Sequence, residues 1–176
     1  GIIVCAMRHL DMQTNINMLH EAMELYGAGV VGCDIAGDEK PHTNLEYKEF
    51  FDEARRLGIP FTIHSGECGN AVNTHEAIEL GARRVGHGIA MMNHEDIIRE
   101  CVSNHIGVEM CPISNMQTKA VREFLKYPFP LFYKEGVLLS INTDNRTVSN
   151  TTCEKEWKML SRIYDFTMDD VNKIYR

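Results

Sequence analysis

The sequence predicts an α/β fold of parallel strands that alternate with helices, and two patterns support this prediction. Short runs of apolar and β-branched residues, typical of strands buried on both faces, alternate with stretches of helical periodicity. Many helical stretches close near a glycine. Six strands are expected, at residues 2–7, 30–35, 60–63, 84–85, 106–110 and 137–141. Strands separated by helices in this way form parallel βαβ units.

Helix starts are expected where a capping residue precedes an acidic residue by three positions. These pairs are Asn73 with Glu76, Asn93 with Asp96, Thr151 with Glu154, and Thr167 with Asp170. Helix ends are expected at five glycines, namely Gly27, Gly58, Gly81, Gly107 and Gly136. The helix expected over residues 45–57 has an apolar stripe for the core, formed by Tyr47, Phe50, Phe51, Ala54 and Leu57.

Polar residues follow nearly every expected strand, and this distinguishes a closed barrel from an open sheet. In a (β/α)8 barrel, functional groups lie at the carboxyl ends of many strands, whereas an open doubly wound sheet gathers its ligands at one switch point. The sequence contains neither a G-x-G-x-x-G motif nor a Walker loop. We therefore predict an α/β fold of the TIM (β/α)8 barrel type, of which residues 1–176 form one partial domain of about six βα units.

Composition limits the classes of ligand. The 176 residues carry a net charge of −7 with a pI near 5.6, which argues against binding to nucleic acid or an anionic membrane and fits a small neutral or cationic ligand. The six cysteines form no Cys-x-x-Cys motif, which indicates a reducing cytoplasm rather than a disulfide scaffold. The sequence shows no lipidation motif or long apolar run, so no membrane association is expected.

Four residues at the expected strand ends favour a metal-dependent hydrolytic site. His64 ends a strand and Glu67 follows three residues later, while His87 and Asp144 follow two other strands. Two imidazoles and two carboxylates are costly to desolvate unless they pair or bind a cation. A purely structural network of these side chains is the alternative.

Structural or surface positions are expected for two other histidines and one cysteine. A lone histidine on a helix or at its end is more often a surface residue than a ligand, so His94 and His105 are expected at the surface. Cys111, which precedes a proline, is expected in the core. The roles of His9 and His42 are left open.

Five motifs resemble, in order and spacing, the signature of the adenosine deaminase family of zinc-dependent hydrolases. They are Asp34-Ile-Ala-Gly-Asp-Glu39, His64-Ser-Gly-Glu67, Val85-Gly-His-Gly88, Glu109-Met-Cys-Pro112 with Ser114-Asn115, and Ser140-Ile-Asn-Thr-Asp-Asn145. The resemblance covers nearly the whole chain and implies a barrel of the metal-dependent hydrolase type, with these strands as the third to the eighth. It also implies hydrolytic deamination of adenosine and deoxyadenosine to inosine and ammonia in purine salvage.

The resemblance implies a role for each matching catalytic residue. His64 and Asp144 would ligate one Zn²⁺ ion, and Glu67 would pass a proton to purine N1. His87 would orient the zinc-bound hydroxide and stabilise the developing alkoxide. Asp144 would also help to take a proton from the attacking water.

Substrate contacts are implied at two further positions. Gly37 resembles the backbone group that meets purine N3, and Asn145, where many relatives have Asp, could donate its amide to N7. The expected partner is therefore a small purine nucleoside, with no nucleic acid and no membrane, and the oligomeric state is left open. The patterns His-x-Glu and Pro-Cys-x-x-Cys, which mark the zinc deaminases that flip bases, do not occur.

One family feature is missing from these 176 residues, namely a His-x-His pair on the first barrel strand that supplies two further zinc ligands. We therefore expect a piece of a longer protein, without the first barrel strands. By itself, such a piece would bind zinc weakly and show no useful activity.

Two alternatives stay open. A relative that acts on adenine, AMP or a modified adenosine would keep the same zinc chemistry, although residues 145–150 look more like the nucleoside branch. A noncatalytic or growth-factor-like relative could keep the barrel, but the intact set of four site residues weighs against it.

Overall fold

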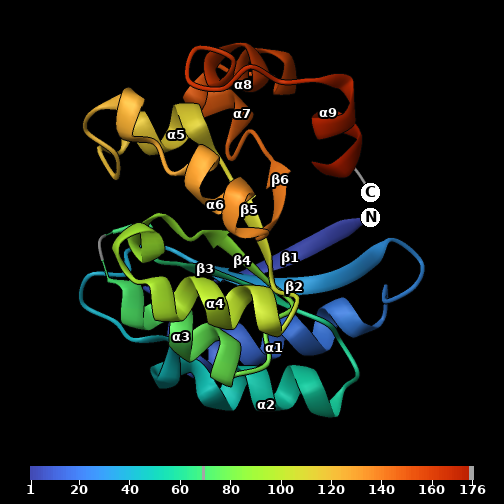
Figure 1. The fold of residues 1–176 in the computed structure, drawn as a ribbon. Coiled ribbons are helices and arrows are strands. Elements are labelled where there is room, and N and C mark those ends of the chain that lie inside the picture. The colour runs from blue at the N-terminus through green and yellow to red at the C-terminus, as the bar shows by residue number, and fades with distance from the viewer. Residues whose placement is uncertain (69, 175–176) are drawn as a thin grey trace.

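The computed structural model describes residues 1–68 and 70–174, and a parallel sheet lies at its centre (Figure 1). The strands of this part of the chain follow one another across the sheet in chain order. A parallel bridge between Cys33 and Phe61 joins the first two strands to the other four. The strands are β1 (Ile2–Met7), β2 (Val30–Ala36), β3 (Thr62–Ser65), β4 (Arg84–His87), β5 (Gly107–Met110) and β6 (Leu138–Ile141).

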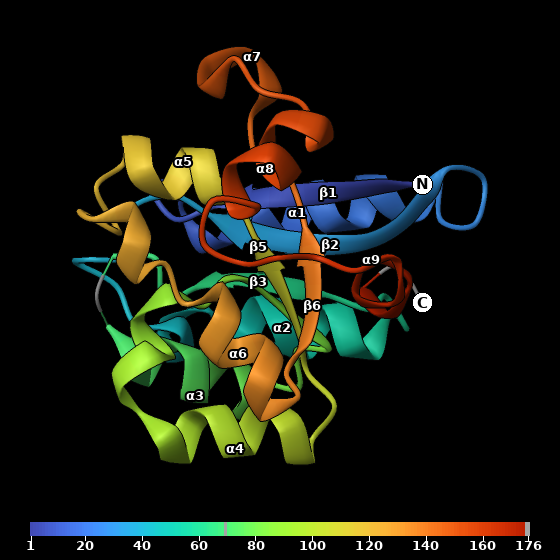
Figure 2. The ribbon, with the colours of Figure 1, turned by 45° about the horizontal axis from the view of Figure 1, so that its top comes forward.

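Helices connect successive strands (Figures 1 and 2). Helices α1 to α4 form one group next to strands β1 to β4, and helices α5 to α9 lie around β5 and β6. The first four are α1 (Met12–Met23), α2 (Lys48–Arg56), α3 (Ala71–Glu79) and α4 (Glu95–Ser103). They are followed by α5 (Pro112–Gln117), α6 (Phe129–Glu135), α7 (Arg146–Ser149), α8 (Cys153–Leu160) and α9 (Met168–Ile174). Short 3-10 helices lie at η1 (Asn44–Tyr47), η2 (Ile89–Asn93) and η3 (Phe124–Lys126).

The predicted strands are all confirmed, but most predicted helix starts are displaced. Only the pair Thr167 and Asp170 forms the predicted cap, because each side chain accepts the backbone N–H of the other. The other capping residues are Asn70, His94 and Thr152, not the predicted Asn73, Asn93 and Thr151. Asn73 lies fully buried inside α3, where its backbone carbonyl accepts a hydrogen bond from Asn44. Tertiary contact has therefore overridden the local capping signal.

Three of the five predicted helix-ending glycines are confirmed. Gly58, Gly81 and Gly136 follow α2, α3 and α6 with φ of 73°, 87° and 83°, which is the left-handed conformation of a helix C-terminus. Gly27 instead lies in the turn beyond the end of α1, and Gly107 is the first residue of β5. His105, with φ of 54°, takes the left-handed position after α4.

Alternation along the strands separates a packed outer face from a polar inner face. Ile63 and Met110 are fully buried in the hydrophobic core that the helices cover. On the opposite face, Arg84 donates from Nε to Glu109 Oε1 at 2.7 Å and from Nη2 to Ser140 Oγ at 2.8 Å. The largest fully buried side chains of the core include Phe50, Phe51, Phe129 and Phe132. The inner face is thus the polar interior of a barrel.

The parallel strand order with helices outside confirms a partial (β/α)8 barrel. The outer strands of the described sheet are β1 and β6, on which Ile2, Ile3 and Leu138 are 62%, 48% and 54% exposed. Within residues 1–68 and 70–174, no helix combines the length and the hydropathy needed to cross a membrane.

Replacing Phe51 by alanine should remove much of the stability of this core. The Phe51 ring is fully buried, with its centroid 4.8 Å from that of Phe61 and 5.2 Å from that of Phe50. Because the variant loses these contacts and keeps a cavity, we expect the free energy of unfolding to fall by about 3–5 kcal/mol. Urea denaturation measures this loss. The control is Leu125→Ala at a residue that is 81% exposed, and equal losses in both variants would contradict the packing described.

Candidate active site

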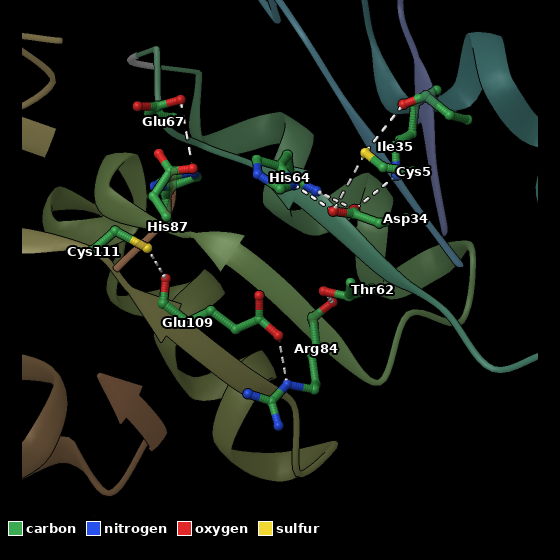
Figure 3. Close-up of polar contacts among 12 residues, drawn as sticks. Cys5, Asp34, Ile35, Thr62, His64, Glu67, Arg84, His87, Glu109 and Cys111 are labelled. Carbon is green, nitrogen blue, oxygen red and sulfur yellow. Dashed lines mark hydrogen bonds and ion pairs between the residues drawn. The ribbon is translucent and has the colours of Figure 1, made fainter. Parts of the chain in front are cut away.

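The four predicted site residues lie at the carboxyl ends of β3, β4 and β6. His64 is part of β3 and His87 is the last residue of β4, and their ring centroids are 5.0 Å apart. Glu67 follows β3 and faces His87, as Figure 3 shows. Asp144 follows β6, and its charge acts on both imidazoles. The structure therefore brings His64, Glu67 and His87 together, with Asp144 near enough for its charge to act on both imidazoles.

His64 is held from behind by Asp34 of β2. The Nδ1 atom of His64 is 2.7 Å from Asp34 Oδ2, although the two groups are not aligned as a hydrogen bond. The other carboxylate oxygen of Asp34 accepts the backbone N–H groups of Ile35 and His64, at 2.7 Å and 3.2 Å. Burial alone would lower the pKa of His64, but the interaction with Asp34 outweighs it and raises the pKa to about 9. Asp34 thus occupies the Nδ1 side and leaves Nε2 for another partner.

His87 is 1% exposed and has a φ of 67°, a left-handed conformation that is unfavourable for a residue other than glycine. Its surroundings must therefore hold it in place. Asn115 Nδ2 contacts His87 Nδ1 at 2.9 Å, and His87 Nε2 lies 3.7 Å from Glu67 Oε2. Burial lowers the pKa of His87 and outweighs the opposing charge of Glu67, which favours the neutral imidazole.

Glu67 is positioned from two sides. The hydroxyl of Thr118 donates to Glu67 Oε1 at 3.1 Å. Behind the loop, Oε2 of the buried Glu39 accepts the backbone N–H groups of Glu67 and Cys68, at 3.2 Å and 3.5 Å. Burial raises the pKa of Glu39, and the positive charge of Arg8 opposes this rise. The loop that presents Glu67 is therefore fastened to a buried acid.

Asp144 and Asn145 are exposed residues after β6. The hydroxyl of Ser114 donates to Asp144 Oδ2 at 2.6 Å, and the Asn145 backbone N–H donates to Asp144 Oδ1 at 2.8 Å. Asn145 also caps α7, because its Oδ1 accepts the Val148 N–H at 3.0 Å. The side-chain carbonyl of Asn145 is thus engaged, and its NH₂ group is the one that can donate to a ligand.

Gly37, predicted to meet the substrate, is exposed after β2 and has a φ of 114°. A Cβ atom at this position would lie 3.4 Å from the backbone nitrogen and from the Cβ atom of Arg8. The backbone conformation favours glycine, whereas the distance to Arg8 is an ordinary van der Waals contact. The backbone at Gly37 is therefore left open to solvent, as a group that meets a ligand must be.

A buried polar network beneath the site was not predicted from the sequence. Arg8 Nη2 donates to Asn44 Oδ1 at 2.6 Å and to the His64 carbonyl at 2.9 Å. Asn44 donates from Nδ2 to Ser65 Oγ at 2.8 Å and from its backbone N–H to Glu76 Oε2 at 2.7 Å. The partners are 21 to 56 residues apart in the chain, so no local motif could have revealed them.

The remaining predicted positions lie outside this cluster. His94 and His105 are exposed and Cys111 is buried, as predicted. The two histidines left open are now placed at the surface. His9 is exposed, and His42 Nδ1 contacts Glu46 Oε2 at 2.9 Å.

The donor set of the described residues fits part of a metal site. His64 carries a carboxylate behind Nδ1, which is the pairing typical of metal-ligating histidines. This Nδ1 atom is buried without an aligned hydrogen-bond partner. Among residues 1–68 and 70–174, however, no group of three His, Cys, Asp or Glu side chains is arranged to hold a metal ion. Because zinc sites need three or four protein ligands, His64 and Asp144 fit as two members of a larger set.

Comparisons with known sequences point to one family. The family model described as Adenosine deaminase matches residues 1–176. The adenosine deaminase of Enterococcus faecalis is 38% identical over 172 residues, which are 98% of this chain and 51% of the relative. That of Clostridium acetobutylicum is 39% identical over 177 residues, which are 100% of this chain and 53% of the relative. The chain thus spans about half the length of these relatives.

Two solved structures share the fold. An adenine deaminase from Arthrobacter aurescens superposes with a TM-score of 0.89 at 21% identity, covering 98% of this chain and 53% of that chain. An N6-methyl-AMP deaminase from Arabidopsis thaliana superposes with a TM-score of 0.88 at 21% identity. The match covers 98% of this chain and 50% of that chain. At this identity the likeness concerns the fold alone.

Replacing Asp34 by asparagine should change how the stability of the metal-free protein depends on pH. The folded pKa of His64, about 9, lies above its ordinary value of 6.5. The pair therefore stabilises the fold fully below pH 6.5, and this stabilisation is lost as the pH rises through 9. Since one unit of pKa shift corresponds to about 1.4 kcal/mol, we expect Asp34→Asn to cost on the order of 2–3 kcal/mol more near pH 6 than near pH 10.

Urea unfolding of both proteins at these two pH values measures the difference. Asp52→Asn serves as the control, because Asp52 pairs with Lys48 and Arg55 at the surface and away from any histidine. Its effect should be small and equal at both pH values. An Asp34→Asn cost that does not change with pH would rule out the assigned role of the pair.

Proposed function

Because the chain belongs to the adenosine deaminase family, we propose that the protein containing it deaminates adenosine and deoxyadenosine by hydrolysis, releasing ammonia and leaving the corresponding inosine. One observation carries the proposal. Glu67, His64 and His87 meet at the ends of adjacent strands, with the imidazoles 5.0 Å apart and Glu67 3.7 Å from His87 Nε2. A carboxyl group beside two imidazoles can hold a cation and move protons within one small volume.

His64 and Asp144 would hold a zinc ion, together with ligands from outside the described residues. A zinc ion there supplies a water molecule whose pKa lies near 7. Asp34 supports this role, because it occupies the Nδ1 side of His64 and leaves Nε2 for another partner. The adenosine deaminase family implies this metal, and the donor chemistry of His64 and Asp144 agrees with it.

The remaining side chains move and hold protons. Glu67 donates a proton to purine N1, which makes C6 more electrophilic, and later carries a proton to the departing ammonia. His87 donates a hydrogen bond from Nε2 to the oxygen that adds to C6. Asp144 accepts a proton from the attacking water, while the Ser114 hydroxyl holds its Oδ2 in place at 2.6 Å. Burial favours the neutral form of His87, which suits a hydrogen-bond donor.

Two groups are proposed to orient the purine. The Gly37 backbone would meet N3, since glycine leaves this backbone open to a ligand. Asn145 would donate its NH₂ group to N7, since its carbonyl oxygen is engaged in capping α7. Contacts on both edges of the ring would place C6 at the site.

We further propose that residues 1–176 are a partial barrel domain without useful activity of their own. The chain spans about half of its relatives, and the described residues supply only two of the expected metal ligands. The six free cysteines support a location in a reducing cytoplasm, and the reaction belongs to purine metabolism.

The alternative substrates share the same chemistry. Solved neighbours of the fold include an adenine deaminase and an N6-methyl-AMP deaminase, so adenine, AMP and modified adenosines belong in any test. A noncatalytic relative is the other alternative. Release of ammonia from adenosine, deoxyadenosine, adenine and AMP, and of methylamine from N6-methyl-AMP, measured with the full-length protein, ranks these substrates. Preference for adenosine and deoxyadenosine supports the proposal, whereas preference for another substrate, or no release from any of them, overturns it.

Replacing Glu67 by glutamine should abolish most turnover while leaving the fold intact. Glutamine keeps the shape and the contact with Thr118 but cannot deliver a proton to the purine. We expect kcat to fall by about 10²–10⁴-fold, the usual contribution of a positioned proton donor. Steady-state kinetics on adenosine measures this effect. Glu49→Gln, at an exposed residue of α2, should leave kcat unchanged, and a Glu67→Gln variant of normal activity would assign the proton to another group.

A further inference from the structure

A chain of three buried side chains ends on His87. Asn115 on α5 is 0% exposed and Tyr127, just before α6, is 2% exposed. The Tyr127 hydroxyl contacts Asn115 Oδ1 at 3.1 Å, and Asn115 Nδ2 contacts His87 Nδ1 at 2.9 Å. None of these contacts is explained by the motifs that carry the proposed chemistry.

The direction of these hydrogen bonds follows from the Tyr127 hydroxyl. A carbonyl oxygen can only accept, so the Tyr127 hydroxyl must be the donor where it meets Asn115 Oδ1. The phenol then donates to Asn115 Oδ1, which leaves the Asn115 NH₂ group toward His87. An NH₂ group can only donate, so the imidazole nitrogen facing it must be an acceptor.

We propose that Asn115 is a positioning residue that holds His87 in the tautomer with its proton on Nε2, so that His87 presents a hydrogen-bond donor to the reacting centre. The inference rests on the proposed function only for the identity of that centre. It explains how His87 can donate a hydrogen bond at the site. In the other tautomer, the Nε2 atom that faces Glu67 and the incoming oxygen would carry no proton.

The rest of the site does not select this tautomer. Glu67 Oε2, at 3.7 Å from His87 Nε2, lies beyond normal hydrogen-bond length. The His64 ring meets the His87 ring edge-on, with centroids 5.0 Å apart. The 2.9 Å contact with Asn115 is therefore the shortest polar contact of the imidazole among the described residues. Tyr127 acts one step further back, because its hydroxyl donates to Asn115 Oδ1 and so favours the amide orientation with the NH₂ group toward His87.

The test compares Asn115→Asp with wild type in the full-length, metal-loaded protein. A carboxylate of the same shape accepts instead of donating, so it draws the His87 proton to Nδ1. Imidazole ¹⁵N chemical shifts, assigned with a His87→Gln variant, report which nitrogen carries the proton. We expect wild type to show the proton on Nε2 and Asn115→Asp to show it on Nδ1. We also expect kcat to fall by about a hundredfold or more, with KM changed less than threefold.

A second variant keeps the test decisive if Asn115→Asp does not fold. Tyr127→Phe removes the hydroxyl that orients the Asn115 amide, and should give a mixture of His87 tautomers with kcat reduced about tenfold. Two matched controls make the same chemical changes elsewhere. Asn93→Asp lies at an exposed residue of η2, and Tyr133→Phe removes a hydroxyl that contacts Asp170. Both controls should leave the His87 nitrogen shifts unchanged.

The outcomes separate this inference from the proposed function. A wild-type protein with the His87 proton on Nδ1, or a folded Asn115→Asp protein with wild-type nitrogen shifts, overturns the inference even if adenosine is deaminated. Shifts that respond as expected in a protein that deaminates no nucleoside support the positioning role and overturn the proposed function.

Discussion

The candidate site depends on the close parallel pairing of β3 and β4, which places the His64 ring beside Gly86. A Cβ atom at Gly86 would lie 3.3 Å from the Cα, Cγ and Nδ1 atoms of His64, so a larger residue would push the imidazole away. The same pairing sets Ser65 opposite His87 and brings the two rings to a centroid distance of 5.0 Å. The backbone register thus sets the spacing between the imidazoles, and the side chains around them only refine it.

Holding these groups in place has an energetic cost. Arg8 and Glu39 are 3% and 2% exposed, and atoms of both have no hydrogen-bond partner among the described residues. Unpaired buried polar atoms each cost about 1–3 kcal/mol, which the attraction between opposite charges offsets only in part. The same residues hold the His64 carbonyl and the Glu67 N–H. A network of this kind favours a fixed loop over maximal stability, as is common at functional sites.

Local patterns in the sequence predicted the strands because buried parallel strands appear as short apolar, β-branched runs bounded by turn residues. Helix starts were less determined. Asn70 and Asn73 can both cap a helix, but Asn70 caps α3, and Asn73 is buried inside it, where its backbone carbonyl accepts a hydrogen bond from Asn44. The site residues His64 and His87 were predictable from their motifs. Asn115 also belongs to one of these motifs, but its contact with His87, 28 residues away in the chain, was not predictable, because it exists only in the folded state.

The two imidazoles of the site have opposite surroundings, and this difference explains how neighbouring histidines can do different work. A carboxylate faces His64, so its positive form is favoured and its pKa is raised to about 9. An amide faces His87, and burial lowers its pKa. Where environments separate the pKa values of adjacent groups, they assign different chemical roles. The surroundings of His64 attract a cation, whether a proton or a metal ion, and a cation held there further disfavours charge on His87. The neutral donor and the cation-binding ligand therefore depend on each other.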